Sequence, residues 1–439
     1  MDISNLLAAR LQMAVSLGFH IIFAAIGVAM PFFMAVSHYF YIKTGKKVYL
    51  DLTKAWSKGV AIFFATGAVS GTVLSFELGL LWPGFMKHAG PIIGMPFSWE
   101  GTAFFLEAIA LGLFLYGWDK LKPWVHWTCG LVVGISGVAS AMFVICANSW
   151  MNSPSGFDWV NGEAINIDPV AAMFNDAALM QGLHMVIASF QATGVAVAGL
   201  HAFLLIKDRK NIFHKQALKI ALCFAAAFSL VQPIAGDLLA KDTVKRQPVK
   251  FAAMESLFET QKGAPLLLGG IPDVENRTVN YGIHIPYLLS FLAHADFNAE
   301  VKGLNDFDRD LWPPVPVTHY AFQIMVGIGT LLALSMPLML LLAFRYPEKL
   351  TQNLSLYFLS FCVPLGFIAI ESGWVVTEVG RQPWIIHGIM KTKDAVTPVP
   401  GMVYSFIAIS ILYIILALLV AILMRSQIKA LPEEYSRKP

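Results

Sequence analysis

Long apolar runs alternate with short polar segments along nearly the whole chain. A transmembrane helix needs about 20 predominantly apolar residues, and the apolar runs here reach that length. The pattern predicts an all-α, polytopic membrane helical bundle of about nine transmembrane helices. The predicted spans are residues 13–40, 55–82, 97–118, 125–148, 181–206, 217–240, 319–344, 354–377 and 401–424.

The longest polar segment divides the chain into three expected parts. Residues 1–240 form a six-helix membrane part, residues 241–318 an extracytoplasmic loop, and residues 319–439 a three-helix membrane part with a cytoplasmic tail. A loop of this length inside a compact protein is usually functional. We therefore expect the loop to contribute to a binding site.

Lysine and arginine residues gather in every second connection, which predicts the orientation of the chain. The short connections on the opposite side contain few basic residues, and the 149–180 connection contains none. The basic residues of the long 241–318 loop are discounted, because long loops cross the membrane regardless of charge. By the positive-inside rule, the N-terminus lies outside and the C-terminus lies in the cytoplasm. The basic connections are residues 43–58, 120–122, 207–219, 345–349 and 425–438.

Composition agrees with a chain that is solvated mostly by lipid. Apolar residues make up 57% of the chain, charged residues 13%, and the mean hydropathy is +0.64. A net charge of +3 is too small to favour nucleic acid as a partner. The four cysteines lie in apolar runs without CxxC or CxxCH spacing, which predicts buried apolar thiols and excludes a c-type haem attachment.

The N-terminal sequence MDISNLLAAR lacks the basic region of a cleavable signal peptide. We therefore expect the first apolar run to remain as a helix.

Ionisable side chains inside the predicted spans are the first candidates for function. Each costs at least about 2.5–3.5 kcal/mol at the bilayer centre, so it is a functional-site candidate by default. The set comprises His20, Glu77, Glu100, Glu107, His184, His201, Asp237, Glu371 and Glu378. Hydration at the membrane interface is the simpler explanation for the histidines near helix ends, which are His38, His88, His126, His201 and His214.

His20 and His184 differ from those histidines because each lies several residues inside an apolar run. A single buried histidine is more often a packing residue than a ligand. Two in separate helices favour a bound metal or haem, since imidazole is the commonest protein ligand of haem iron. Histidine paired with methionine gives an electron-transfer haem, and Met325 is a candidate partner, although any one of 18 methionines more often packs the core.

Glu100 and Glu107 are seven residues apart in one predicted span. On a helix they lie on nearly the same face, about 10.5 Å apart along the axis. Two stacked buried carboxyl groups are suited to a proton relay. The alternative is that one of them only caps the start of its helix.

Several strings resemble subunit I of the cytochrome bd ubiquinol/menaquinol oxidases, over essentially the whole chain. The most specific is GWVVTEVGRQPW at 373–384, which is similar to the GWxxxExGRQPW signature of that family. Further matches are NSWMNSP (148–154), EGTAFFLEA with YGWDKL (100–122), RLQxxxxxxFH ending at His20, GLHMVIAS around His184 and QPVKFAAMES (247–256).

The resemblance implies an iron ligand set. His184 and Met325 correspond to the axial ligands of a low-spin haem b. His20 and Glu378 correspond to the axial ligands of two high-spin haems, and Glu100 to a residue beside the oxygen-reducing one. Which of these two haems takes which ligand stays open.

The resemblance also implies roles outside the ligand set. Lys250 and Glu255 match loop residues associated with quinol oxidation, and Arg381 matches the arginine of GRQPW. Trp374 matches an aromatic residue between haems. Glu107 and Ser140 match positions on a proton path.

Three features depart from the better-known enterobacterial members. One residue fewer separates the two glutamates of the third span, and FQIM replaces FRIM, which places Gln323 where an arginine would lie near the low-spin haem. Loss of that cation should lower the potential of the haem. The outer loop is also short, without the optional insertion of the family.

The implied function is that of a terminal quinol oxidase in a bacterial or archaeal cytoplasmic membrane. Quinol is oxidised at the outer face, and O2 is reduced to water at a high-spin haem pair. Protons for water come from the cytoplasm along Glu107 and Glu100, and charge is separated without a pump. The implied cofactors are low-spin haem b, high-spin haem b, and haem d or a further haem b.

The implied partners are subunit II, small single-helix subunits, quinol, O2 and the lipid bilayer. Two other functions stay open. One is a proton-coupled secondary transporter, although the chain has no internal repeat and nine spans do not divide into equal halves. The other is an oxidase of the same fold that contains only haem b.

Overall fold

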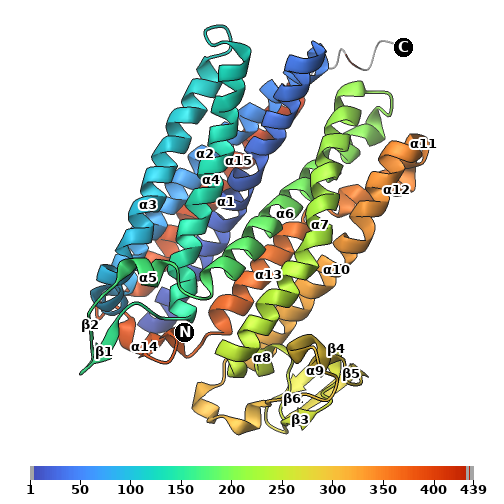
Figure 1. The fold of residues 1–439 in the computed structure, drawn as a ribbon. Helices are drawn as coiled ribbons and strands as arrows, with labels where there is room; N and C mark the ends of the chain where they lie inside the picture. Colours follow the sequence, from blue (N-terminus) through green and yellow to red (C-terminus); the bar gives the residue numbers. More distant parts are fainter. Residues whose placement is uncertain (1–3, 432–434, 436–439) are drawn as a thin grey trace.

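The computed structural model describes residues 4–431 and residue 435. Within these residues nine helical spans are long and apolar enough to cross a membrane, which confirms the predicted bundle. Figure 1 shows them running side by side. They are α1 (Asn5–Thr44), α2 (Lys47–Leu81), α3 (Pro83–Tyr116), α4 (Pro123–Asn152), α6 (Ala178–Lys207), α7 (Ile212–Arg246), α10 (Val315–Arg345), α12 with α13 (Asn353–Phe361 and Leu365–Val379) and α15 (Met402–Lys429).

Two helix boundaries differ from the hydropathy pattern. Only Trp82 separates α2 from α3, so residues 83–96, expected as a connection, form the first turns of α3. Pro83 starts that helix at a position where the missing N–H costs no hydrogen bond. The eighth span is divided into α12 and α13 just before Pro364, because proline cannot donate to the preceding turn.

Close backbone contacts hold the second half of the bundle together. In Figure 1, α10, α12 and α13 lie around α6 and α7, whereas α2, α4 and α15 pack against α1, and α3 packs mainly against α4. A Cβ atom at Gly366 of α13 would lie 2.5 Å from the Cα atom of Ala192 in α6, and one at Gly194 would lie 2.7 Å from the backbone N of Ala225 in α7. Only glycine allows the helices to approach this closely.

The predicted loop of residues 241–318 is a folded layer at one end of the bundle (Figure 1). A β4–β5 hairpin is its largest part, and His319 of α10 ties the layer to the bundle. The Nδ1 and Nε2 atoms of His319 lie 2.9 Å and 3.2 Å from the carbonyl oxygens of Met254 and Gly269. The elements are α8 (Pro248–Met254), β3 (Gln261–Lys262), β4 (Leu266–Asp273), β5 (Thr278–Ile285), α9 (Leu288–His294), β6 (Glu300–Val301), η1 (Leu304–Asp306) and η2 (Arg309–Leu311).

Short elements fill the other connections. The 149–180 connection contains the β1–β2 hairpin and α5, and the segment after α13 contains the β7–β8 pair and α14. Their bounds are β1 (Asp158–Val160), β2 (Glu163–Ile165), α5 (Pro169–Met173), α11 (Pro347–Leu350), β7 (Trp384–Ile386), β8 (Met390–Lys391) and α14 (Thr392–Ala395).

Hydration at helix ends was the wrong explanation for four histidines. His38, His126, His201 and His214 are buried. The Nδ1 atoms of His201 and His214 lie 3.0 Å apart, and the Nε2 atom of His126 lies 2.7 Å from the carbonyl oxygen of Phe114. These rings therefore join helix ends inside the protein.

The cysteine prediction is correct for two residues. All four thiols are free, and Cys146 and Cys362 are buried. Cys223 is exposed on α7 and Cys129 is half-buried, so these two do not pack the core.

We predict that Gly366→Ala lowers stability by about 1–3 kcal/mol, the usual cost of overpacking, because its Cβ atom would meet the backbone of α6. Gly327→Ala on α10 is the matched control, since a Cβ atom there meets nothing within 4 Å. The measurement is thermal unfolding in detergent. Equal transition temperatures for the two variants would contradict the packing argument.

Candidate functional site

His20 lies between α1 and α2. Its Nδ1 atom lies 2.9 Å from the Ser70 hydroxyl, which fixes the ring from one side. A Cβ atom at Gly71 would lie 3.0 Å from the His20 Cε1 atom, so a glycine is needed for the ring to sit here. The Nε2 atom is the ring nitrogen left for a ligand.

His184 and Met325 lie on α6 and α10, two helices that both pack against α7 and α13. The Gln232 amide nitrogen of α7 lies 3.4 Å from Nδ1 and 3.3 Å from Nε2 of His184. Because both distances are long and nearly equal, neither contact is a strong hydrogen bond. Glycines adjoin both side chains. Gly236 faces the His184 ring, and a Cβ atom at Gly373 would lie 3.0 Å from the Met325 sulfur.

A partly buried ion pair lies at the end of α13. The Arg381 Nη2 atom lies 2.5 Å from Oε2 of Glu378, and Asn148 of α4 donates to Oε1 of Glu378 at 2.7 Å. Arg381 is 3% exposed, and its Nε and Nη1 atoms have no partner among the described residues. Sequence reasoning missed Asn148, although it opens the NSWMNSP string at the end of a predicted span.

Glu100 and Glu107 follow the interface between α3 and α4. Ser140 of α4 donates to Oε1 of Glu100 at 3.1 Å. Glu107 is buried beside Gly137, whose Cβ atom would lie 3.6 Å from the Glu107 carboxyl and 3.3 Å from the Gly27 carbonyl of α1. Glu107 is thus enclosed by α1, α3 and α4, whereas Glu100 is half-buried and bonded to α4.

Lys250 of α8 reaches the end of α13. Its Nζ atom donates to the Thr377 carbonyl oxygen at 3.3 Å, and a Cβ atom at Gly380 would lie 3.1 Å from the Lys250 side chain. Burial and the charge of Arg381 lower the pKa of Lys250 to about 7, against the opposing effect of Glu378. The loop string 247–256 and the GRQPW string are therefore in contact, although more than a hundred residues separate them.

Glu255 follows α8 and is fully buried within the folded layer. Burial raises its pKa to about 8, so the carboxyl group is mostly protonated at neutral pH. Its Oε2 atom has no partner among the residues described. The group is available for a proton or a hydrogen-bonding ligand.

A cavity of about 190 Å³ adjoins Lys250 and Arg381. Burial and the charges of both residues lower the pKa of His387, which also lines it. The cavity is large enough for polar ligand atoms to approach the two cations. Its other lining residues are Gln247, Val249, Leu311, Pro313, Gly380, Gln382, Trp384 and Gly388.

Two further residues have surroundings that the sequence did not reveal. Gln323 ties α10 to β4, because its amide donates to the Leu267 carbonyl at 3.0 Å and its oxygen accepts from the Gly269 N–H at 3.1 Å. Trp374 packs beside Ile21, and its indole N–H has no partner in the described chain.

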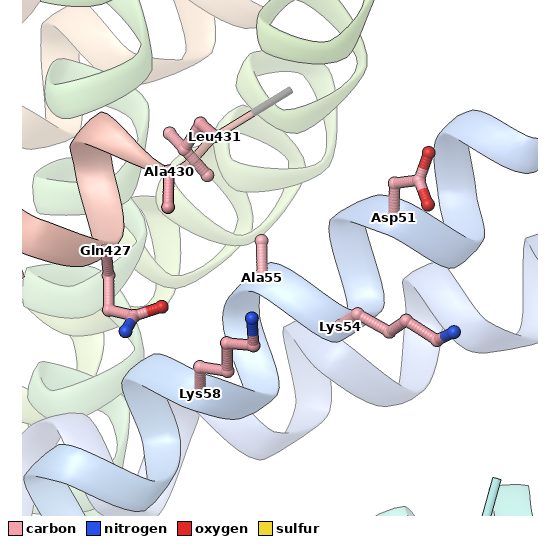
Figure 2. A pocket seen from close by; sticks show the side chains of 7 residues that line it. All are labelled: Asp51, Lys54, Ala55, Lys58, Gln427, Ala430 and Leu431. Atoms are coloured by element: carbon pink, nitrogen blue, oxygen red, sulfur yellow. The ribbon is translucent and has the colours of Figure 1, made fainter. Parts of the chain in front are cut away.

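A second cavity, of about 150 Å³, lies away from these residues (Figure 2). The first turns of α2 and the end of α15 line it with Asp51, Lys54, Lys58 and Gln427. The Lys54 ammonium also lies 5.2 Å from the Trp118 ring centroid. These lysines belong to a predicted cytoplasmic basic cluster, so the cavity is not part of the candidate site.

Comparisons with known proteins identify the family to which the chain belongs. The family model of "Cytochrome bd terminal oxidase subunit I" matches residues 8–432. A Bacillus subtilis protein described as "Putative cytochrome bd menaquinol oxidase subunit I" is 36% identical over 421 residues, which are 94% of each chain. The cytochrome bd ubiquinol oxidase subunit 1 of the same organism is 32% identical over 444 residues, covering 97% of this chain and 94% of that one.

The fold is also similar to a solved structure. A chain of the bd oxidase from Geobacillus thermodenitrificans superposes with a TM-score of 0.92 and 38% identity, covering 98% of this chain and 99% of the other. The family match, the sequence relatives and the structural neighbour agree along nearly the full length. This chain belongs to the cytochrome bd terminal oxidase subunit I family.

Proposed function

We propose that the chain is the haem-bearing, quinol-oxidising subunit of a respiratory terminal oxidase. The observation that carries the proposal is the buried contact of Lys250 with the end of α13, beside Arg381 and Glu378. This contact joins the loop proposed to bind quinol to the helix proposed to bind haem. Family membership argues against the alternative of a secondary transporter.

The residues present fit haem. The glycines beside His20, His184 and Met325 leave no competing side chain next to the candidate ligand atoms. Arg381 offers two guanidinium nitrogens without a partner among the described residues, and their N–H groups suit the carboxylates of a haem. When bound, haem supplies the one-electron redox chemistry that amino-acid side chains lack.

We assign His184 and Met325 to the low-spin haem b, because a histidine with a methionine would suit an electron-transfer haem that does not bind oxygen. His20 and Glu378 would hold the two high-spin haems, Glu100 would serve the one that reduces oxygen, and Trp374 would lie between haems. The optical spectrum distinguishes haem d from a further haem b.

Quinol oxidation releases protons, and the folded layer offers groups to receive them. The buried Glu255 carboxyl accepts a proton from a quinol hydroxyl in its ionised form, and its raised pKa suits it to hold that proton. Lys250 uses its ammonium group to hold the other polar end of the head group. We infer that these protons leave at the outer face.

Protons for water come from the cytoplasm in this proposal. The Glu107 to Glu100 interface is the proposed path, with the Ser140 hydroxyl bonded to Glu100. Uptake on one side and release on the other separate charge without a pump. The N-terminus is then outside and the C-terminus in the cytoplasm, within a bacterial or archaeal cytoplasmic membrane.

The proposed protein partners are subunit II and small single-helix subunits. Helix α15 leaves a large apolar surface exposed, because only 6% of its most apolar window is buried. This surface suits contact with lipid or with an apolar protein partner. Quinol and O2 are the proposed substrates.

We expect haem bands in the reduced-minus-oxidised optical spectrum of the purified protein. A far-red band establishes haem d, and b-type bands alone establish the haem-b-only oxidase. A protein prepared with its membrane partners and still without haem bands would contradict the oxidase proposal.

We expect His184→Ala and Met325→Leu to remove the low-spin haem b signal and to leave the high-spin haems, because each change deletes one axial ligand. Met339→Leu is the matched control, since Met339 is a buried methionine on the same helix. Optical and electron paramagnetic resonance spectra measure both signals. A low-spin signal that survives both changes would show that the ligand assignment is wrong.

We expect Lys250→Ala and Glu255→Gln each to lower kcat/KM for quinol at least about 10-fold, mainly by raising KM. This is the loss expected when one charge-assisted hydrogen bond is removed. The rate of the unaltered protein should pass through a maximum between about pH 7 and 8, because Glu255 gains a proton below about 8 and Lys250 loses its ammonium charge above about 7. Glu255→Gln should abolish the acid limb of this profile, and Lys250→Ala should abolish the alkaline limb.

The exposed Lys262 of β3 provides the control variant Lys262→Ala. Steady-state oxidation of quinol at several pH values gives KM, kcat and the pH profile. Loss of the haem spectrum in the Lys250 or Glu255 variants would assign these residues a structural role instead.

A further inference from the structure

Four buried polar side chains lie close together where α1, α2 and α15 pack against one another, three helices that Figure 1 shows in the same half of the bundle. They are Gln12 and Ser16 of α1, Glu77 of α2 and Tyr413 of α15. Each is at most 3% exposed. The sequence marked Glu77 as an ionisable residue in a span and Gln12 as part of the RLQxxxxxxFH string, but the proposed function does not use any of the four.

The contacts place these side chains in one cluster. Gln12 donates from Nε2 to Oε1 of Glu77 at 2.7 Å. Ser16 lies beside both the Glu77 carboxyl and the Tyr413 hydroxyl without the geometry of a full hydrogen bond. The Tyr413 ring packs on Phe19 of α1, with ring centroids 4.6 Å apart.

Every member of the cluster has an oxygen atom without a hydrogen-bond partner in the described chain. The four atoms are Gln12 Oε1, Ser16 Oγ, Glu77 Oε2 and Tyr413 Oη. Buried polar groups in proteins are almost always satisfied, by protein or by ordered water. One buried water makes about three hydrogen bonds, so the site calls for water.

Charge gives a second requirement. The ion pairs found among the described residues do not include Glu77, and the groups that face it from α1 and α15 are an amide, a hydroxyl and a phenol. An ionised carboxylate without a cation is costly in such a place. A bound proton removes this cost and supplies a donor for one of the free oxygens.

The cluster continues toward His20. Residues 12, 16 and 20 follow one face of α1 at intervals of about 6 Å along the axis. Gln12 contacts Glu77, and His20 contacts Ser70, across the same interface with α2. Ser16 lies between these two contacts, so hydroxyl groups extend from the carboxyl group to the histidine.

We propose that Gln12, Ser16, Glu77 and Tyr413 form a hydrated proton-binding site in which Glu77 carries the proton. The site responds to the redox state of the centre at His20, because an added electron nearby favours the neutral acid over the carboxylate. The proton comes from bulk solvent through the water of the site, which is left as neutral water, and no bond other than O–H is formed or broken. This response rests on the proposed role of His20 as a haem ligand, whereas the bound proton does not.

The test is infrared spectroscopy of the purified complex in H2O and D2O, in absolute and in reduced-minus-oxidised form. We expect a protonated carboxyl band that shifts in D2O, changes with reduction and disappears in Glu77→Gln. Tyr413→Phe removes one hydroxyl and should shift the band without abolishing it. Ser75→Ala is the control, because Ser75 is on the exposed side of α2 and donates only to the Gly71 carbonyl.

Two outcomes would overturn the inference. A carboxyl band that persists unchanged in Glu77→Gln belongs to another residue, and a protein with no such band has an ionised Glu77. If the Glu77→Gln protein does not assemble, a carboxyl band that is not shifted in Tyr413→Phe would contradict the inference. An absolute band without a redox response, in a protein without haem bands, refutes the proposed function and leaves the proton site standing.

Discussion

A polar group inside a bilayer must find its partner within the protein, and the rest of this structure depends on that constraint. Glu378 is held by Arg381 and Asn148, Glu100 by Ser140, and His20 by Ser70. In each case at least one partner lies on a different helix. The chemistry-bearing side chains therefore also fix how the helices stand next to one another.

The ion pair at the end of α13 stabilises the fold and leaves hydrogen-bond donors free. Removing one partner of a fully buried pair typically costs about 3–5 kcal/mol, because the remaining charge is left uncompensated, and here the Arg381 side of the pair is buried. Arg381 pairs through Nη2 only, and its Nε and Nη1 atoms have no partner in the described chain. The guanidinium therefore stabilises the fold through Glu378 and retains donors for an anionic group.

Glycine has a complementary part in the bundle. At Gly366 and Gly194 it lets backbones approach, while at Gly71 and Gly373 it makes space beside a candidate ligand side chain. A packed interior transmits small changes in volume, so these positions are as constrained as the ligands they adjoin. Glycine residues therefore set both how closely the helices pack and how much space is left beside the candidate ligands.

The sequence by itself determined the nine spans and the basic connections, because hydropathy and charge are local properties. The family strings added candidate roles for residues such as His184 and Lys250. Other features depend on the register between helices. The Asn148–Glu378 contact, the anchoring of β4 by Gln323 and the cluster around Glu77 join residues far apart in the chain. Only the tertiary structure decided them, because a hydropathy pattern gives the length of each helix but not which of its faces meets which neighbour.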